Sequence, residues 1–193
     1  MALAKYSRTA EGGFSLLEVL FATSLLTVAV VSLAQLFVVS TRANTSARAT
    51  TFAAIFAQQK MEQLRGLTWG FDTLGLPLTD TSSNTTAAAQ TATGGSGLSP
   101  SPAGTLGANV DGFCDYLDAN GASLGGGTTV PAGAIYIRRW SIEPLPTNPN
   151  NTLVLQVLVT RNRNRGDAAE NAIGVTRLPD EARIISVKTR KAT

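Results

Sequence analysis

The sequence contains no histidine and only one cysteine among its 193 residues. The absence of imidazole excludes a histidine general base and a histidine-ligated metal. The single cysteine, Cys114, excludes a disulfide within the chain and a cysteine-rich metal cluster. A lone thiol can be a nucleophile, but it is more often a small buried hydrophobe, and we expect that role for Cys114. We therefore predict no cofactor and no metal.

Lys and Arg are absent between Gly66 and Ile137, where every charged side chain is an aspartate. These aspartates are Asp72, Asp80, Asp111, Asp115 and Asp118. From Arg138 onward the balance reverses, and Lys and Arg outnumber the acids. A solvated surface accounts for most of this asymmetry, and charge matching between subunits is an additional use. The net charge of +3 is too small to indicate nucleic-acid binding by itself.

Large apolar side chains are almost missing from Thr79–Gly107, which is rich in Thr, Ser, Ala and Gly. Such a segment cannot bury enough surface to offset chain entropy. We predict a long flexible loop over residues 68–134, with Phe113–Leu117 as its only anchored part. Residues 84–86 match a glycan acceptor pattern, but patterns this short often arise by chance.

A long apolar run, Phe14–Val39, follows the polar segment Met1–Gly13. As a helix the run is about 39 Å long, enough to cross a hydrocarbon core of about 30 Å. Its Ser and Thr hydroxyls can bond back to the helix and cost little in lipid. A plain secretory signal has a shorter apolar region and then a cleavage site, so residues 14–39 are predicted to span a membrane.

The helical pattern continues through residues 40–67 but becomes amphipathic. Apolar residues recur at steps of three and four, at Ala49, Ala53, Ala57, Met61 and Leu64, with Phe52 and Phe56 beside them. Outward positions are predicted for Arg42, Arg48, Gln59 and Glu62. Lys60 and Arg65 are expected to complement the helix dipole, and Gly66 to end the helix.

Residues 135–193 contain three predicted strands. IYIRRWSI, from Ile135, is followed by LVLQVLVT, in which Leu153, Leu155, Val157 and Val159 alternate onto one face. In the third, Ala182–Thr189, we expect Ile185 and Val187 to point inward. Short turn-rich links favour an antiparallel meander. The predicted fold class is α+β, a long N-terminal helix packed on a small antiparallel sheet.

Residues 12–18 read GGFSLLE and place one acid, Glu18, inside the apolar run. A carboxylate there costs about 2.5–3.5 kcal/mol on insertion scales, which indicates a function and a partner. A new N-terminus at Phe14 would supply a cation about one helical turn away. Two simpler roles stay open: Glu18 as a helix-start acid, and Gly12-Gly13 as a flexible hinge.

The stretch GFSLLEVL resembles the prepilin cleavage and methylation motif of type IV pilins and type II secretion pseudopilins. The resemblance implies that a membrane prepilin peptidase cuts between Gly13 and Phe14 and methylates the Phe14 amine. Pairing of the Phe14 amine with the Glu18 carboxylate of a neighbouring subunit would set the register between subunits. The helix end AQQKMEQLRGL is similar to that of minor pilins grouped as pilus-modification proteins.

Two departures from many major pilins favour a minor pilin or a pseudopilin. The apolar run has no proline near its middle, where Gln35 stands instead, and one cysteine cannot close a C-terminal loop. The resemblance implies a single-pass inner-membrane precursor that later enters a periplasmic or extracellular filament. Its implied partners are other pilin subunits, the prepilin peptidase and the assembly machinery. A type II secretion pseudopilin is the alternative.

A signal-anchored periplasmic enzyme or binding protein is the alternative of another class. Without histidine, an enzyme would need Ser with Lys, or paired carboxylates, and neither occurs at a recognisable spacing. We therefore predict that the chain is not an enzyme. DNA binding through Arg161, Arg163 and Arg165 is also disfavoured, because no aromatic residues interleave with these arginines for base stacking.

Overall fold

The computed structural model describes residues 13–86, 94–162 and 181–190. It divides into two compact units, Met1–Thr45 and Ser46–Thr193. One helix, α1 (Leu16–Gly66), contributes residues to both units. Its last residue is the glycine that the sequence predicted as the helix end.

In the first unit, every described side chain of α1 up to Thr45 is exposed. The helix contains a stretch that is long and apolar enough to cross a membrane, judged by length and composition. A helix that is apolar on all sides needs apolar surroundings, and no residue in the described part of the chain covers these side chains. This unit therefore presents an apolar surface outward.

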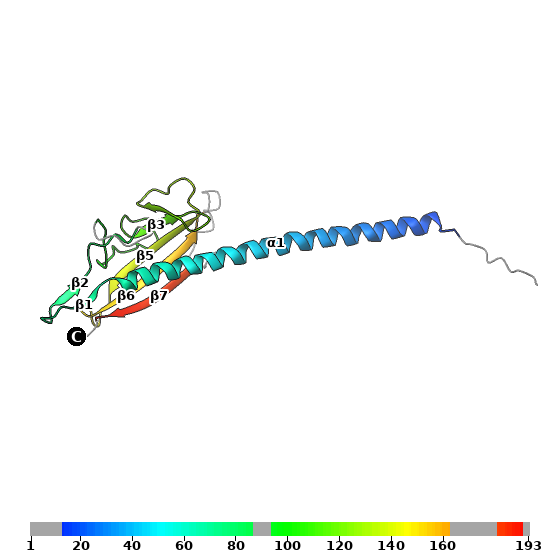
Figure 1. Cartoon of the computed structure of the whole chain (residues 1–193). Coiled ribbons are helices and arrows are strands. Elements are labelled where there is room, and N and C mark those ends of the chain that lie inside the picture. Colours follow the sequence, from blue (N-terminus) through cyan, green and yellow to red (C-terminus); the bar gives the residue numbers. More distant parts are fainter. Residues whose placement is uncertain (1–12, 87–93, 163–180, 191–193) are drawn as a thin grey trace, which may run out of the picture. The chain divides into compact units, whose positions relative to one another are not determined.

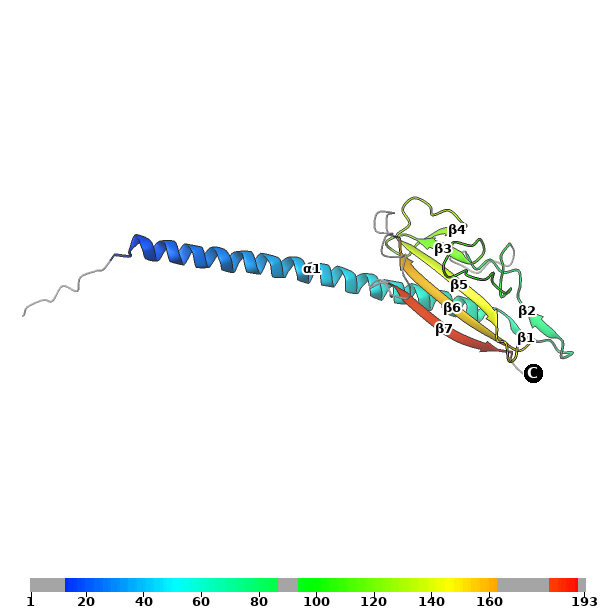
Figure 2. The ribbon, with the colours of Figure 1, turned by 180° about the vertical axis from the view of Figure 1, so that it is seen from behind.

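The second unit contains a five-stranded antiparallel sheet (Figure 1). The three predicted strands are confirmed as β5 (Tyr136–Pro144), β6 (Thr152–Arg161) and β7 (Ala182–Thr189). Two short strands, β3 (Cys114–Leu117) and β4 (Ser123–Gly126), extend the sheet beyond β5. The order is β4-β3-β5-β6-β7, and it can be followed from behind in Figure 2.

A separate two-stranded sheet, formed by β1 (Trp69–Phe71) and β2 (Pro77–Thr79), follows the helix. Arg190, just after β7, holds it in place. The Arg190 guanidinium lies 3.6 Å from the centre of the Trp69 ring and donates to the carbonyls of Gly70 and Leu78. The predicted loop over residues 68–134 is therefore wrong at both of these strands.

The part of α1 from Ser46 to Gly66 packs on the sheet through the predicted stripe. Its buried residues are Ala49, Ala53, Phe56, Ala57, Lys60, Met61 and Leu64. On the opposing face, the alternating residues of β6 are buried as predicted, namely Leu153, Leu155, Val157 and Val159. The helix residues predicted to face outward are exposed, namely Arg42, Arg48, Gln59 and Glu62.

The end of α1 is stabilised by a cation from β7, which the helical pattern alone does not predict. Lys188 of β7 donates from Nζ to the carbonyls of Leu64, Arg65 and Leu67. These are carbonyls at the helix end, where a positive charge also complements the dipole. Lys60, which was expected in this role, is instead fully buried.

The inward face of β7 was predicted wrongly. Ile185 and Val187 are each 59% exposed, whereas Ile184 packs against the core. Ile184 is the register partner of Val157, which is buried. Directly paired residues of neighbouring strands share a face, so pairing with β6 fixes the phase of β7.

The prediction that Phe113–Leu117 is the only anchored part of the long loop is also wrong. Leu98 is only 1% exposed and belongs to the main core, and its backbone N–H donates to the Asp80 carbonyl at 2.7 Å. Gly97 has φ +50, and a Cβ there would lie 2.5 Å from the Asp80 oxygen. One leucine and a tight glycine turn thus anchor a segment of otherwise small residues.

Candidate functional site

The predicted cleavage position lies just before α1 begins. Gly13, Phe14 and Ser15 are exposed and not helical, and the Phe14 side chain is 85% exposed. A Cβ added to Gly13 would meet no atom within 4 Å. The Gly13–Phe14 bond therefore lies in chain that an enzyme can reach, and Gly13→Ala introduces no clash there.

Glu18 lies in the first turn of α1 and is exposed. Within residues 13–86, 94–162 and 181–190, its carboxylate has neither a hydrogen bond nor a salt bridge. An acid on an apolar surface with no partner among the described residues is suited to pair with a cation on another molecule. Glu18 lies four residues after Phe14 in the sequence, and α1 begins between them, at Leu16.

Hydroxyl groups on this part of α1 are satisfied by the helix itself. Thr23 donates to the Val19 carbonyl at 2.9 Å, Thr27 to the Thr23 carbonyl at 2.8 Å, and Ser32 to the Val28 carbonyl at 2.8 Å. Ser24 makes the same kind of bond to Phe21. These bonds suit a helix that is surrounded by lipid or by other apolar helices.

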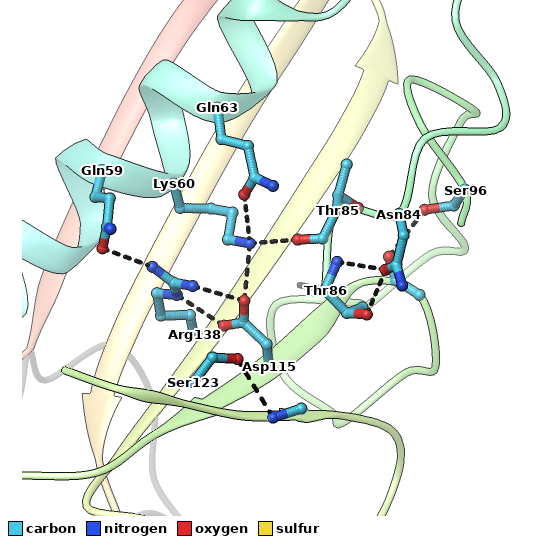
Figure 3. A network of polar contacts seen from close by, with 12 residues as sticks. Gln59, Lys60, Gln63, Asn84, Thr85, Thr86, Ser96, Asp115, Ser123 and Arg138 are labelled. Carbon is cyan, nitrogen blue, oxygen red and sulfur yellow. Dashed lines mark hydrogen bonds and ion pairs between the residues drawn. The ribbon is translucent and has the colours of Figure 1, made fainter. Parts of the chain in front are cut away.

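A second candidate site, a buried ionic cluster, lies inside the globular unit (Figure 3). The Asp115 carboxylate accepts from Lys60 Nζ at 2.8 Å, and from Arg138 Nε and Nη2 at 2.7 Å each. The Lys60 and Asp115 side chains are 0% exposed, and that of Arg138 is 3% exposed. One anion thus holds two cations away from water.

The cluster's other contacts join four segments of the chain. Lys60 Nζ also donates to Gln63 Oε1 at 2.8 Å and to the carbonyl of Thr85, and it lies 4.3 Å from the centre of the Trp140 ring. Arg138 Nη1 donates to Gln59 Oε1 at 3.2 Å. The cluster thereby fixes four segments to one another: α1, the segment around Thr85, β3 and β5.

Burial lowers the pKa of Lys60 from 10.5 to about 8, because desolvation outweighs the attraction of Asp115. A lysine with a lowered pKa can act as a nucleophile or base, but this amine is enclosed. All three charged groups are buried, and their contacts hold α1, β3 and β5 together, so the cluster stabilises the fold of the globular unit.

The remaining aspartates are scattered over the described part of the chain. Asp72 and Asp118 each accept two backbone N–H groups within tight turns. Only Asp115 of this series meets charged partners in the part of the chain that the structure describes. Two features of the sequence could have indicated this role. Asp115 lies within the apolar FCDYL segment, and Lys60 lies on the buried stripe of α1.

Cys114 is fully buried, as expected, and burial raises the pKa of its thiol. Its Sγ lies 3.0 Å from the Gly127 carbonyl, which also accepts from the Tyr116 hydroxyl at 2.7 Å. Arg161 is exposed at the end of β6, whereas Arg163 and Arg165 lie outside the described residues.

Comparisons with protein-family models, with curated proteins and with solved structures give no match for this chain. The fold therefore supports a broader description. The chain has a long N-terminal apolar helix whose last part packs on a small antiparallel sheet, an arrangement consistent with a pilin fold.

Proposed function

We propose that this chain is a minor pilin precursor, processed at Gly13–Phe14 and assembled through its N-terminal helix into a type IV pilus. The observation that carries the proposal is the GFSLLE motif opening a helix whose first part is apolar and entirely exposed. Among the described residues, no side chain covers this part of the helix or pairs with Glu18. Together they fit a subunit that leaves the membrane to join other helices.

The proposed assembly step depends on how the apolar surface is covered. In the bilayer, lipid surrounds the exposed part of α1 at little cost. On extraction, side chains such as Leu20, Leu25 and Phe37 would meet water unless helices of neighbouring subunits cover them. Packing of α1 against equivalent helices is therefore the driving contact of the filament.

Glu18 sets the axial position of one subunit against the next in this proposal. Cleavage before Phe14 creates a cationic α-amine, and the Glu18 carboxylate of a neighbour is its partner. An ion pair in an apolar bundle strongly penalises registers that leave either charge unpaired. The membrane prepilin peptidase, the assembly machinery and other pilins are the implied partners.

A type II secretion pseudopilin is the second candidate, because it would use the same motif and helix. The missing proline in Phe14–Val39 and the single cysteine favour a minor subunit of either machine over a bulk pilus subunit. The machine is identified by the filament with which the chain co-purifies. A signal-anchored enzyme or binding protein would instead keep Met1–Gly13 or lose the whole apolar run.

Filament incorporation of Glu18→Gln tests the proposal against a matched control. Glu62→Gln changes an exposed acid of the same helix whose partner is Arg65 in its own chain. We expect Glu18→Gln to remain in the membrane and to be reduced at least about tenfold in sheared filaments, equivalent to about 1.4 kcal/mol. Glu62→Gln should be incorporated normally. Equal incorporation of both variants would overturn the assembly role.

A further inference from the structure

Gln35 is a polar residue of the apolar run whose side chain has no partner within the helix. Unlike the Ser and Thr hydroxyls, its amide forms no hydrogen bond to any described residue. It is exposed, and no charged residue lies between Glu18 and Arg42. Gln35 is about 26 Å from Glu18 along the helix axis and about 10 Å from Arg42. Its amide is therefore within or at the edge of the apolar zone.

The amide lies on a helix face that is suited to pack against another helix. This Gln35 face consists of residues spaced three and four apart, Phe21, Ser24, Val28, Val31, Gln35 and Val38. All are exposed, and the three valines have a strongly preferred rotamer in helices, so they lose little freedom on packing. Ser24 is small and its hydroxyl is already bonded to Phe21, which permits close approach.

We propose that the Gln35 face pairs two copies of this chain in the membrane, with each Gln35 amide bonded to the other. The inference rests on the proposed membrane-inserted precursor. A side-chain amide has two N–H donors and a carbonyl acceptor, so two of them can satisfy each other reciprocally. Copies inserted in the same orientation place Gln35 at the same depth, and a two-fold axis along the membrane normal brings the amides together.

The pairing also defines what Gln35 contributes beyond the valines. Valine packing alone tolerates sliding and rotation of one helix on the other. A single polar residue in an apolar seam penalises every register that leaves the amide unpaired. The paired helices are therefore fixed in register at Gln35, independently of Glu18 near the other end of the span.

Disulfide trapping in native membranes tests the pairing. Cysteine is introduced at Val31, on the Gln35 face, or at Leu33, on the opposite face, in the full chain carrying Cys114→Ala. Oxidation should give a disulfide-linked dimer at Val31 at least fivefold more efficiently than at Leu33. Adding Gln35→Leu should remove most of the Val31 dimer, and Gln35→Asn, which keeps the amide, should retain part of it.

Three results would overturn the inference: equal trapping at the two positions, trapping at Val31 that Gln35→Leu does not reduce, or a Val31 adduct whose mass identifies a different subunit. Leader removal, scored in the same samples, separates this inference from the proposed function. Cleavage without Gln35-dependent trapping refutes only the pairing. Trapping without cleavage refutes the precursor and leaves a paired membrane helix.

Discussion

The two parts of α1 have a common backbone and opposite surroundings. Up to Thr45 the described side chains are all exposed, although most are apolar; from Ser46 onward a stripe is buried against the sheet. The later part buries its apolar stripe within the chain, against β5 and β6. No residue that the structure describes covers the earlier part. One helix thus carries a stripe that is buried within the chain and a longer apolar surface that stays exposed.

The acids of the two units show the same contrast. Asp115 is buried with Lys60 and Arg138, which come from α1 and β5. Glu18 lies on an apolar surface and has no partner among the described residues. An acid that is satisfied internally stabilises the fold of the globular unit. An acid without an internal partner is available for assembly.

Removing the charge of Asp115 should have the largest effect on the globular unit. Asp115→Asn leaves Lys60 and Arg138 as buried cations without an anion, and we expect a loss of about 3–5 kcal/mol of unfolding free energy. Denaturant unfolding of the full chain in detergent measures this through tryptophan fluorescence, because Trp69 and Trp140 both belong to the globular unit. Glu18→Gln is the control and should leave the unfolding curve unchanged.

Leucine truncation on each part of α1 gives the next largest effect. Leu64 is 0% exposed, so Leu64→Ala should cost about 2–5 kcal/mol of unfolding free energy. Leu26 is 63% exposed on the same helix, and Leu26→Ala should not change unfolding of the globular unit. The same fluorescence measurement compares them. Equal destabilisation by the two variants would mean that the early part of α1 is also packed within the chain.

Lys60 should make the stability of the globular unit pH-dependent. The pKa of Lys60 is about 8 in the folded chain, and its ordinary value is 10.5. At a pH between these two values, the unfolded chain therefore binds more protons than the folded chain. Stability should therefore rise with pH across this window, by up to about 3 kcal/mol. Lys60→Met, which leaves Asp115 paired with Arg138, should lack this rise. Unfolding both proteins at about pH 7 and about pH 10 checks the difference.

The sequence predicted the features that depend on local periodicity. The stripe from Ala49 to Leu64 and the alternation of β6 were visible because each repeats over several turns or residues. The phase of β7 was not, because ARIISVKT has adjacent isoleucines at positions 184 and 185 and fits either face. Only pairing with β6 decides between them.

The candidate sites were predictable to different degrees. Gly13, Phe14 and Glu18 form one short motif, so the sequence alone predicts them as a site, and that prediction awaits the cleavage and assembly experiments. The Lys60–Asp115 pair joins residues distant in the chain, and no local pattern connects them. Lys60 was interpreted as a helix-end cation, and the tertiary fold instead gives it an internal partner and gives the helix end to Lys188.

Mass analysis of the intact protein and its N-terminal peptide, taken from the native membrane, tests the central claim most directly. We expect a mature chain that begins at methylated Phe14. This product should be lost in Gly13→Ala, although the structure has space for the added methyl group. Gly12→Ala, the same change one residue earlier, is the matched control and should still be cut. A chain that retains Met1, or one that begins after Val39, would contradict the account.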